Sequence, residues 1–166
     1  MHDQILEMTM VPQAAHIITF SPTGTTRQVV DAIARGFAVP IDQSIDLTHS
    51  DARDPVVFDE PDGIVVIGMP VYSGRVPEIA LSRLQSMTSS GVPAVVCVVY
   101  GNRAYDDALL ELRDAVATAG FRPVAGAAFI GEHSFSRGLV PIAAGRPEHK
   151  DLSLATQVGR QVNSTL

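Results

Sequence analysis

Four hydroxyl side chains surround one glycine in the segment Ser-Pro-Thr-Gly-Thr-Thr at 21–26. A β-branched, apolar stretch at 15–20 precedes this segment, and apolar residues at helical spacing follow it up to Gly36, which predicts a strand, a tight loop and a helix. The N–H groups of such a loop and of the first helical turn lack partners inside the helix, so they can bind an anion. The loop contains no Lys or Arg, which argues against a Walker-type nucleotide site, because such a site needs a lysine on the outer phosphates. The pattern predicts a site for one terminal phosphate, formed by Ser21, Thr23, Gly24, Thr25 and Thr26.

The alternative for this loop is an ordinary helix start, in which Thr23, Thr25 or Thr26 caps the first turn. Capping and phosphate binding are compatible with each other. Four hydroxyls are more than one cap requires, so phosphate binding is the stronger prediction.

Two later loops combine glycine with tyrosine. Met-Pro-Val-Tyr-Ser-Gly-Arg-Val-Pro occupies 69–77, and Tyr-Gly-Asn-Arg-Ala-Tyr-Asp occupies 100–106. Only 5% of the residues are aromatic, and a planar ligand is bound by stacking on aromatic faces, so Tyr72 and Tyr105 are candidate neighbours of a ring. The alternative is a partly buried loop tyrosine without a ligand.

The elements that must position these loops follow from the apolar pattern. Strands are predicted at 15–20, 41–47, 63–69, 94–99 and 124–130. Helices are predicted from the first loop to Gly36, from Pro77 to just before Gly91, at 106–119 and at 151–162. A surface loop is expected at 48–61, with 56–58 against the core, and a long irregular segment at 131–146.

Strands that alternate with helices predict an α/β fold with a doubly wound, five-stranded parallel sheet in the order 2-1-3-4-5. In that order the three loops leave the carboxyl ends of strands one, three and four. Ligands of such sheets bind beyond these ends at the switch point between strands one and three. The three loops are therefore expected to form one crevice in a three-layer sandwich.

Length and composition limit the function. The 166 residues suit one domain at 14–166 behind a flexible leader at 1–13, which lacks the basic and apolar parts of a signal peptide. The net charge of −6 argues against nucleic acid, and no apolar run approaches the roughly 20 residues that span a bilayer. The five histidines show no metal-ligand spacing. We expect a cytoplasmic protein with no membrane, nucleic-acid or metal partner.

The three loops resemble the FMN-binding loops of flavodoxins. The pattern Ser-x-Thr-Gly-x-Thr at 21–26 is similar to the flavodoxin loop that holds the 5′-phosphate, and the two later loops fall where flavodoxins flank the flavin ring. With Gly-Glu-His-Ser-Phe-Ser at 131–136, the chain most resembles the flavodoxin-like half of proteins that join a flavodoxin to a bacterial-type ferredoxin. The resemblance implies FMN as the cofactor and adds these contacts: Pro70, Val71, Tyr72, Ser73, Gly74, Tyr100, Gly101, Asn102, Arg103, Tyr105 and Asp106.

The resemblance also implies roles within the two ring loops. Tyr105 falls at the position of the coplanar flavodoxin tyrosine, and Tyr72 or Val71 is expected to cover the other face of the ring. The peptide Ser73-Gly74 is expected to flip on reduction so that a carbonyl accepts from the flavin N5–H, which glycine permits because it tolerates positive φ. The alternative is that Gly74 only completes a turn.

Arg75 and Arg103 depart from the acidic surroundings that flavodoxin rings usually have. An arginine directed at the ring would stabilise the reduced anion and raise the potential. The alternative is that both arginine side chains point into solvent.

Cys97 is the only cysteine, and a bacterial ferredoxin cluster needs four thiolates, so the chain lacks the ligands for the ferredoxin half. We expect an electron carrier that works through flavin semiquinone and hydroquinone states, with a redox protein such as a ferredoxin or a flavin reductase as partner. The alternatives are an FMN-dependent NAD(P)H or quinone reductase and a flavin-free binding module. A hydrolase built on 132–134 is not expected, because no Gly-x-Ser-x-Gly elbow is present.

Overall fold

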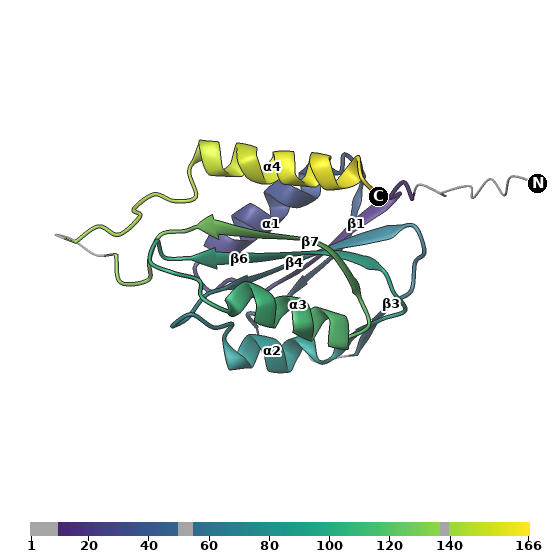
Figure 1. The fold of residues 1–166 in the computed structure, drawn as a ribbon, viewed down its shortest axis with the longest axis horizontal. Helices are drawn as coiled ribbons and strands as arrows, with labels where there is room; N and C mark the ends of the chain where they lie inside the picture. The colour runs from purple at the N-terminus through teal and green to yellow at the C-terminus, as the bar shows by residue number, and fades with distance from the viewer. Residues whose placement is uncertain (1–9, 50–54, 137–139) are drawn as a thin grey trace, which may run out of the picture.

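A computed structural model describes residues 10–49, 55–136 and 140–166 of the chain. Five parallel strands form the central sheet in the order β2-β1-β4-β6-β7 (Figure 1), which confirms the predicted order 2-1-3-4-5. These strands are β1 (Ala14–Thr19), β2 (Ile41–Asp46), β4 (Gly63–Pro70), β6 (Pro93–Tyr100) and β7 (Arg122–Ile130). Of the predicted leader, residues 1–9 lie outside the described residues.

Helices cover both faces of the sheet, with α1 and α4 on one face and α2 and α3 on the other (Figure 1). Their bounds are α1 (Thr25–Gly36), α2 (Glu78–Leu84), α3 (Ala108–Thr118) and α4 (His149–Asn163). A Cβ atom added to Gly36 would lie 2.3 Å from the Thr156 carbonyl oxygen, and one added to Gly159 would lie 2.1 Å from the Ile33 carbonyl oxygen. These two glycines allow α1 and α4 to touch through their backbones. No helix in the described ranges is long and apolar enough to cross a bilayer.

The two central strands are buried along almost their whole length. Every residue of β4 except Pro70 is buried, and so is every residue of β6 except Tyr100. Their side chains alternate between two cores: Val66 packs on the side of α1 and α4, and Val65 packs on the side of α2 and α3. This burial on both faces explains the continuous apolar runs. The carboxyl ends of these strands give the site loops a fixed base.

The predicted second helix is too long. It was expected to continue to just before Gly91, but α2 ends at Leu84, and Met87–Ser89 forms the short strand β5. β5 pairs in parallel with β3, Val56–Phe58, as a separate two-stranded sheet. Met87 falls three residues after Leu84, a spacing that fits a helix, whereas its strand partner lies far back in the chain and leaves no local signal.

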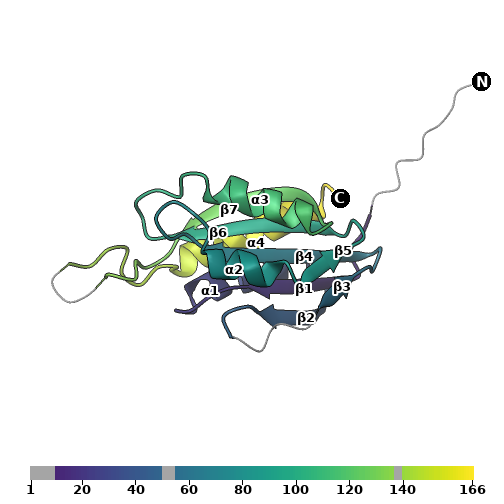
Figure 2. The same cartoon turned by 90° about the horizontal axis from the view of Figure 1, so that it is seen from below.

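The predicted contact of 56–58 with the core is confirmed for Phe58, whose side chain is fully buried, but not for Val57, which is 60% exposed. Residues 50–54 of the same predicted loop lie outside the described residues. Figure 2 shows β3 and β5 at the end of the molecule opposite the long segment after β7. The small sheet is therefore distant from the predicted crevice.

Candidate functional site

Four loops meet in a small cavity beyond the carboxyl ends of the strands. Its volume is about 60 Å³. The lining residues are Pro22, Thr23, Thr25, Thr26, Pro70, Val71, Tyr72, Val99, Tyr100, Gly101, Gly131, Glu132, His133 and Ser134. Sites that enclose a whole small molecule occupy about 300–1,000 Å³, so this cavity can take a small polar group but not an entire nucleotide.

The first loop turns at Gly24, whose φ of 81° is left-handed, and α1 begins at the next residue. In the described chain, no acceptor is found for the N–H groups of Thr25 and Thr26. The Thr23 and Thr25 hydroxyl oxygens lie 3.1 Å apart. Hydroxyls and backbone N–H groups thus line one side of the cavity, where the helix dipole also favours negative charge.

The Ser21 hydroxyl has a different role from those of the threonines. Its Oγ accepts a hydrogen bond of 3.0 Å from the Arg27 N–H and so satisfies one free donor of the first helical turn. The Ser21 N–H donates to the Thr48 hydroxyl at 2.7 Å. Gly24 is the N-cap of α1 and has no side chain, so the hydroxyl that accepts from a first-turn N–H is that of Ser21 rather than one of the three threonines.

The second loop contains a two-residue hairpin turn between Tyr72 and Arg75. Tyr72 N donates to the Arg75 carbonyl at 2.9 Å, and Arg75 N donates to the Tyr72 carbonyl at 3.1 Å. Ser73 and Gly74 have φ values of 52° and 78°, as in a type I′ turn. This geometry supports the simpler alternative, in which Gly74 completes a turn; the peptide flip stays a prediction.

The second and third loops touch at Gly74. A Cβ atom at this position would lie 2.3 Å from Oδ2 of Asp106. Arg75 adds an ion pair to α3, with Nη2 2.6 Å from Oε1 of Glu111, and Val76 N donates to the same carboxylate at 2.8 Å. The hydrogen bond from Arg75 lowers the pKa of Glu111. Arg75 is therefore exposed but bound to α3.

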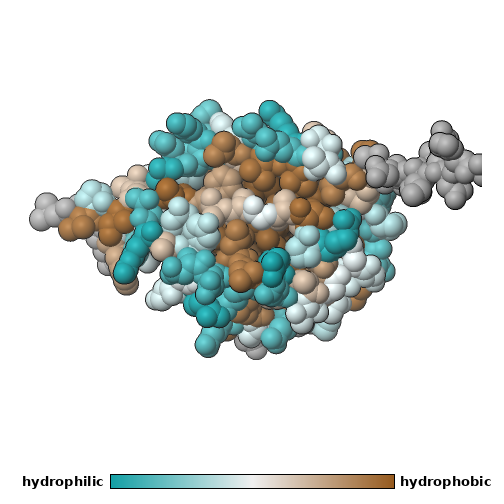
Figure 3. Space-filling model, viewed as in Figure 1, coloured by the Kyte–Doolittle hydropathy of each residue, from teal (hydrophilic) through white to brown (hydrophobic). Residues whose placement is uncertain are grey.

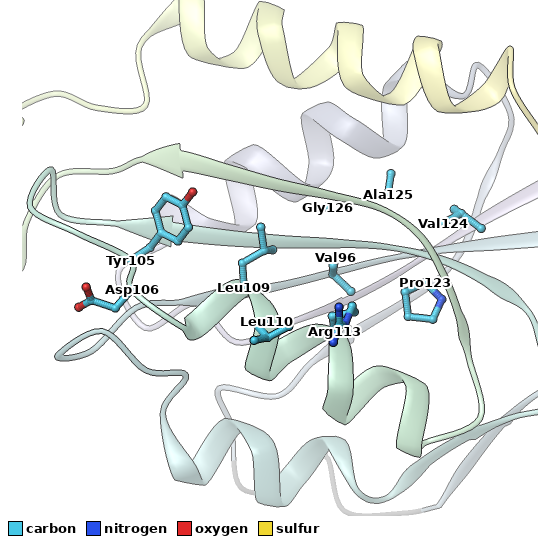
Figure 4. A pocket seen from close by; sticks show the side chains of 10 residues that line it. All are labelled: Val96, Tyr105, Asp106, Leu109, Leu110, Arg113, Pro123, Val124, Ala125 and Gly126. Carbon is cyan, nitrogen blue, oxygen red and sulfur yellow. The ribbon is translucent and has the colours of Figure 1, made fainter.

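The three tyrosines of these loops are divided between two cavities. Tyr72 and Tyr100 line the small cavity, whereas Tyr105 packs edge to face on Tyr100 with ring centroids 5.3 Å apart. Tyr105 lines a second cavity of about 480 Å³ between α3, β6 and β7 (Figure 4). That groove is mostly apolar, with Leu109 and Leu110 on the helix side. It belongs to an apolar area in the middle of this face of the molecule (Figure 3).

The small cavity brings together part of the predicted set. It is lined by Thr23, Thr25, Thr26, Pro70, Val71, Tyr72, Tyr100 and Gly101. The remaining predicted residues lie outside its lining: Ser21, Gly24, Ser73, Gly74, Asn102, Arg103, Tyr105 and Asp106. The fourth wall at 131–134 was expected only as irregular chain; its signal was the Gly-Glu-His-Ser motif itself.

Two observations argue against a cysteine nucleophile and against a metal site in the described residues. Burial raises the pKa of the Cys97 thiol to about 12, so the thiol stays protonated and cannot act as a nucleophile at neutral pH. Within the residues that the structure describes, no three His, Cys, Asp or Glu side chains gather as a metal site requires.

No protein-family model matches the chain, and no curated protein sequence does. Solved structures match it. Flavodoxin 1 from Bacillus cereus gives a TM-score of 0.64 at 18% identity, over 92% of this chain and 99% of that one. A flavodoxin from the domain Archaea gives 0.56 at 14% identity, over 92% and 97%. The Flv1 flavodiiron core from Synechocystis sp. PCC6803 gives 0.61 at 17% identity, and the match covers 94% of this chain but 36% of that one. At these identities the likeness establishes the fold alone: the chain has the flavodoxin-like fold.

Proposed function

We propose that this chain binds FMN and carries electrons between redox proteins. The observation that carries the proposal is the set of donors at the start of α1, where the N–H groups of Thr25 and Thr26 find no acceptor in the described chain. The Thr23 hydroxyl lies beside them in the same cavity. All these donors are neutral, which suits the single terminal phosphate of FMN.

The aromatic residues support a ring beside the phosphate position. Tyr72 is 48% exposed and Tyr105 is 38% exposed, so both offer surface to a planar ligand. Tyr100 lies between the small cavity and Tyr105. The flavin would supply the redox chemistry, and the protein would bind it, orient it and tune its electrostatics.

The partner in this proposal is a redox protein such as a ferredoxin or a flavin reductase. A net charge of −6 favours a partner with a basic docking surface, because complementary charge speeds encounter. Association rates should therefore fall as salt is added.

The phosphate assignment is tested by titrating the protein with FMN and with riboflavin, which lacks the phosphate. Replacing Thr23 and Thr25 together with Ala should weaken FMN binding far more than riboflavin binding, because each hydrogen bond to a charged group contributes about 1.5–3 kcal/mol. Ser21→Ala is the matched control: its hydroxyl is already bonded to Arg27 N, so this variant should lose stability but keep the preference for FMN. Equal losses for both flavins in the threonine variant would contradict the assignment.

A second function, an FMN-dependent NAD(P)H or quinone reductase, is favoured by the groove beside Tyr105. Its volume of about 480 Å³ and apolar lining fall in the range of small-molecule sites. Oxidation of NAD(P)H by the FMN-loaded protein, with and without a quinone, distinguishes this enzyme from a carrier.

A further inference from the structure

The loop at 131–134 passes directly beside the predicted phosphate loop. A Cβ atom added to Gly131 would lie 3.5 Å from Cβ of Thr25 and 2.6 Å from Cγ1 of Val99. No side chain fits between them. Residues 131–134 therefore form a fourth wall of the small cavity.

Main-chain and side-chain hydrogen bonds hold this wall in position. Gly131 N donates to the Tyr100 carbonyl at 2.9 Å, Glu132 N to the Arg146 carbonyl at 2.9 Å, and His133 N to the Ile142 carbonyl at 3.1 Å. Arg146 is in turn paired with the Asp151 carboxylate at the start of α4. The loop is thus tied to both β6 and α4.

The His133 side chain packs closely against the third loop at Gly101. A Cβ atom on Gly101 would lie 2.3 Å from Cδ2 of His133. His133 Nδ1 accepts a hydrogen bond of 3.0 Å from the Phe135 N–H. Because Nδ1 accepts, the neutral ring carries its proton on Nε2. Among the described residues, no hydrogen-bond partner is found for Nε2, and His133 is one of the residues that line the small cavity.

We propose that His133 donates a hydrogen bond from Nε2 to the phosphate of FMN and so helps the site to select FMN over unphosphorylated flavin. This inference rests on the proposed function. It assigns a specificity role to a fourth loop, whereas the phosphate donors named so far all belong to the start of α1. The competing account is that His133 only covers Gly101.

Three variants separate hydrogen bonding from packing. His133→Phe keeps a ring against Gly101 but removes the donor; His133→Gln keeps an N–H donor without the ring; Gly101→Ala displaces the ring and leaves its chemistry intact. His149→Phe, at an exposed position on α4, is the surface control. Dissociation constants for FMN and riboflavin are measured by quenching of flavin fluorescence, after circular dichroism has shown each variant to be folded.

The proposal predicts that His133→Phe weakens FMN binding roughly 10- to 100-fold and leaves riboflavin binding unchanged. His133→Gln should keep most of the FMN preference, Gly101→Ala should lose it, and Gly101→Ala should add no further loss to His133→Phe. A ¹⁵N spectrum of the histidine side chains should show the Nε2–H tautomer for His133 in the flavin-free protein.

An equal loss for FMN and riboflavin in His133→Phe, no loss at all, or an Nδ1–H tautomer would overturn the role of His133 while FMN binding by the parent stands. If the parent protein binds neither flavin, the proposed function fails, and the role of His133 fails with it.

Discussion

Gly74 is the residue at which two loops of the candidate site meet. Its φ of 78° is unfavourable for any other residue, and an added Cβ would lie 2.3 Å from the Asp106 carboxylate. Gly74→Ala should therefore lower the free energy of unfolding in urea by roughly 1–3 kcal/mol. Gly91→Ala is the matched control, because Gly91 has a φ of 99° but no atom within 4 Å of its added Cβ.

The contact with Asp106 can be removed separately. Asp106 itself has a φ of 42°, so Asp106→Gly is compatible with the backbone. In that background the cost of Gly74→Ala should fall to the cost of Gly91→Ala. If the cost of Gly74→Ala is the same with and without Asp106, the two loops do not touch in solution.

At the residue scale, the sequence indicates which hydroxyl side chains lie at the start of α1 but not which group each hydroxyl bonds. Ser21, rather than a threonine, bonds the Arg27 N–H, because the left-handed Gly24 turns the loop back on itself. The free Nε2 of His133 likewise depends on a contact with Phe135 N that no spacing reveals.

At the element scale, the ion pair between Arg75 and Glu111 ties the second loop to α3. The pKa of Glu111 is lowered by the hydrogen bond from Arg75, so the folded pKa lies below the unfolded one. The stabilisation is fully present above the ordinary value of 4.5 and is lost as the pH falls through the lowered folded value. Glu111→Gln should destabilise the protein at neutral pH and converge with the parent in acid, as urea unfolding at several pH values would show.

Asp114→Asn is the control for this prediction, because the Asp114 carboxylate is 60% exposed and its pair with Arg113 lies on the surface. Such pairs contribute little, so this variant should change stability only slightly. A pH dependence in Glu111→Gln that matches the parent would show that the pair does not stabilise the fold.

Alanine substitutions at two glycines in different elements should change the stability of the fold in opposite directions. A Cβ at Gly159 would lie 2.1 Å from the Ile33 carbonyl oxygen, so Gly159→Ala must separate α1 from α4 and should lower the midpoint of thermal unfolding. A Cβ at Gly126 in β7 would lie 3.5 Å from Val96 Cγ2, an ordinary contact. Gly126→Ala should therefore raise stability, by about 0.4–1 kcal/mol. A lower midpoint for Gly126→Ala would mean that the groove beside α3 is filled in solution.

The buried strands could be predicted because apolar residues run through them without interruption, as in β4 and β6. β5 could not be predicted, since Met87 could be buried equally well in a strand or in a helix. Its pairing with Val56 depends on tertiary contacts that leave no local pattern.

At the scale of the whole molecule, the topology predicted from the sequence brings three of the four loops together. They leave the carboxyl ends of β1, β4 and β6, which are neighbours in the sheet. The fourth loop could not be predicted from periodicity. It reaches Thr25 because the chain must cross from β7 to α4, and α4 packs beside α1.

The most direct test of the central claim is stepwise anaerobic reduction of the FMN-loaded protein, followed by its absorption spectrum. The carrier function predicts that FMN stays bound and that one-electron-reduced flavin, with its long-wavelength absorption, accumulates midway through the titration. Direct passage to two-electron-reduced flavin would contradict the carrier and favour the reductase, and a protein that retains no flavin at all would contradict FMN binding.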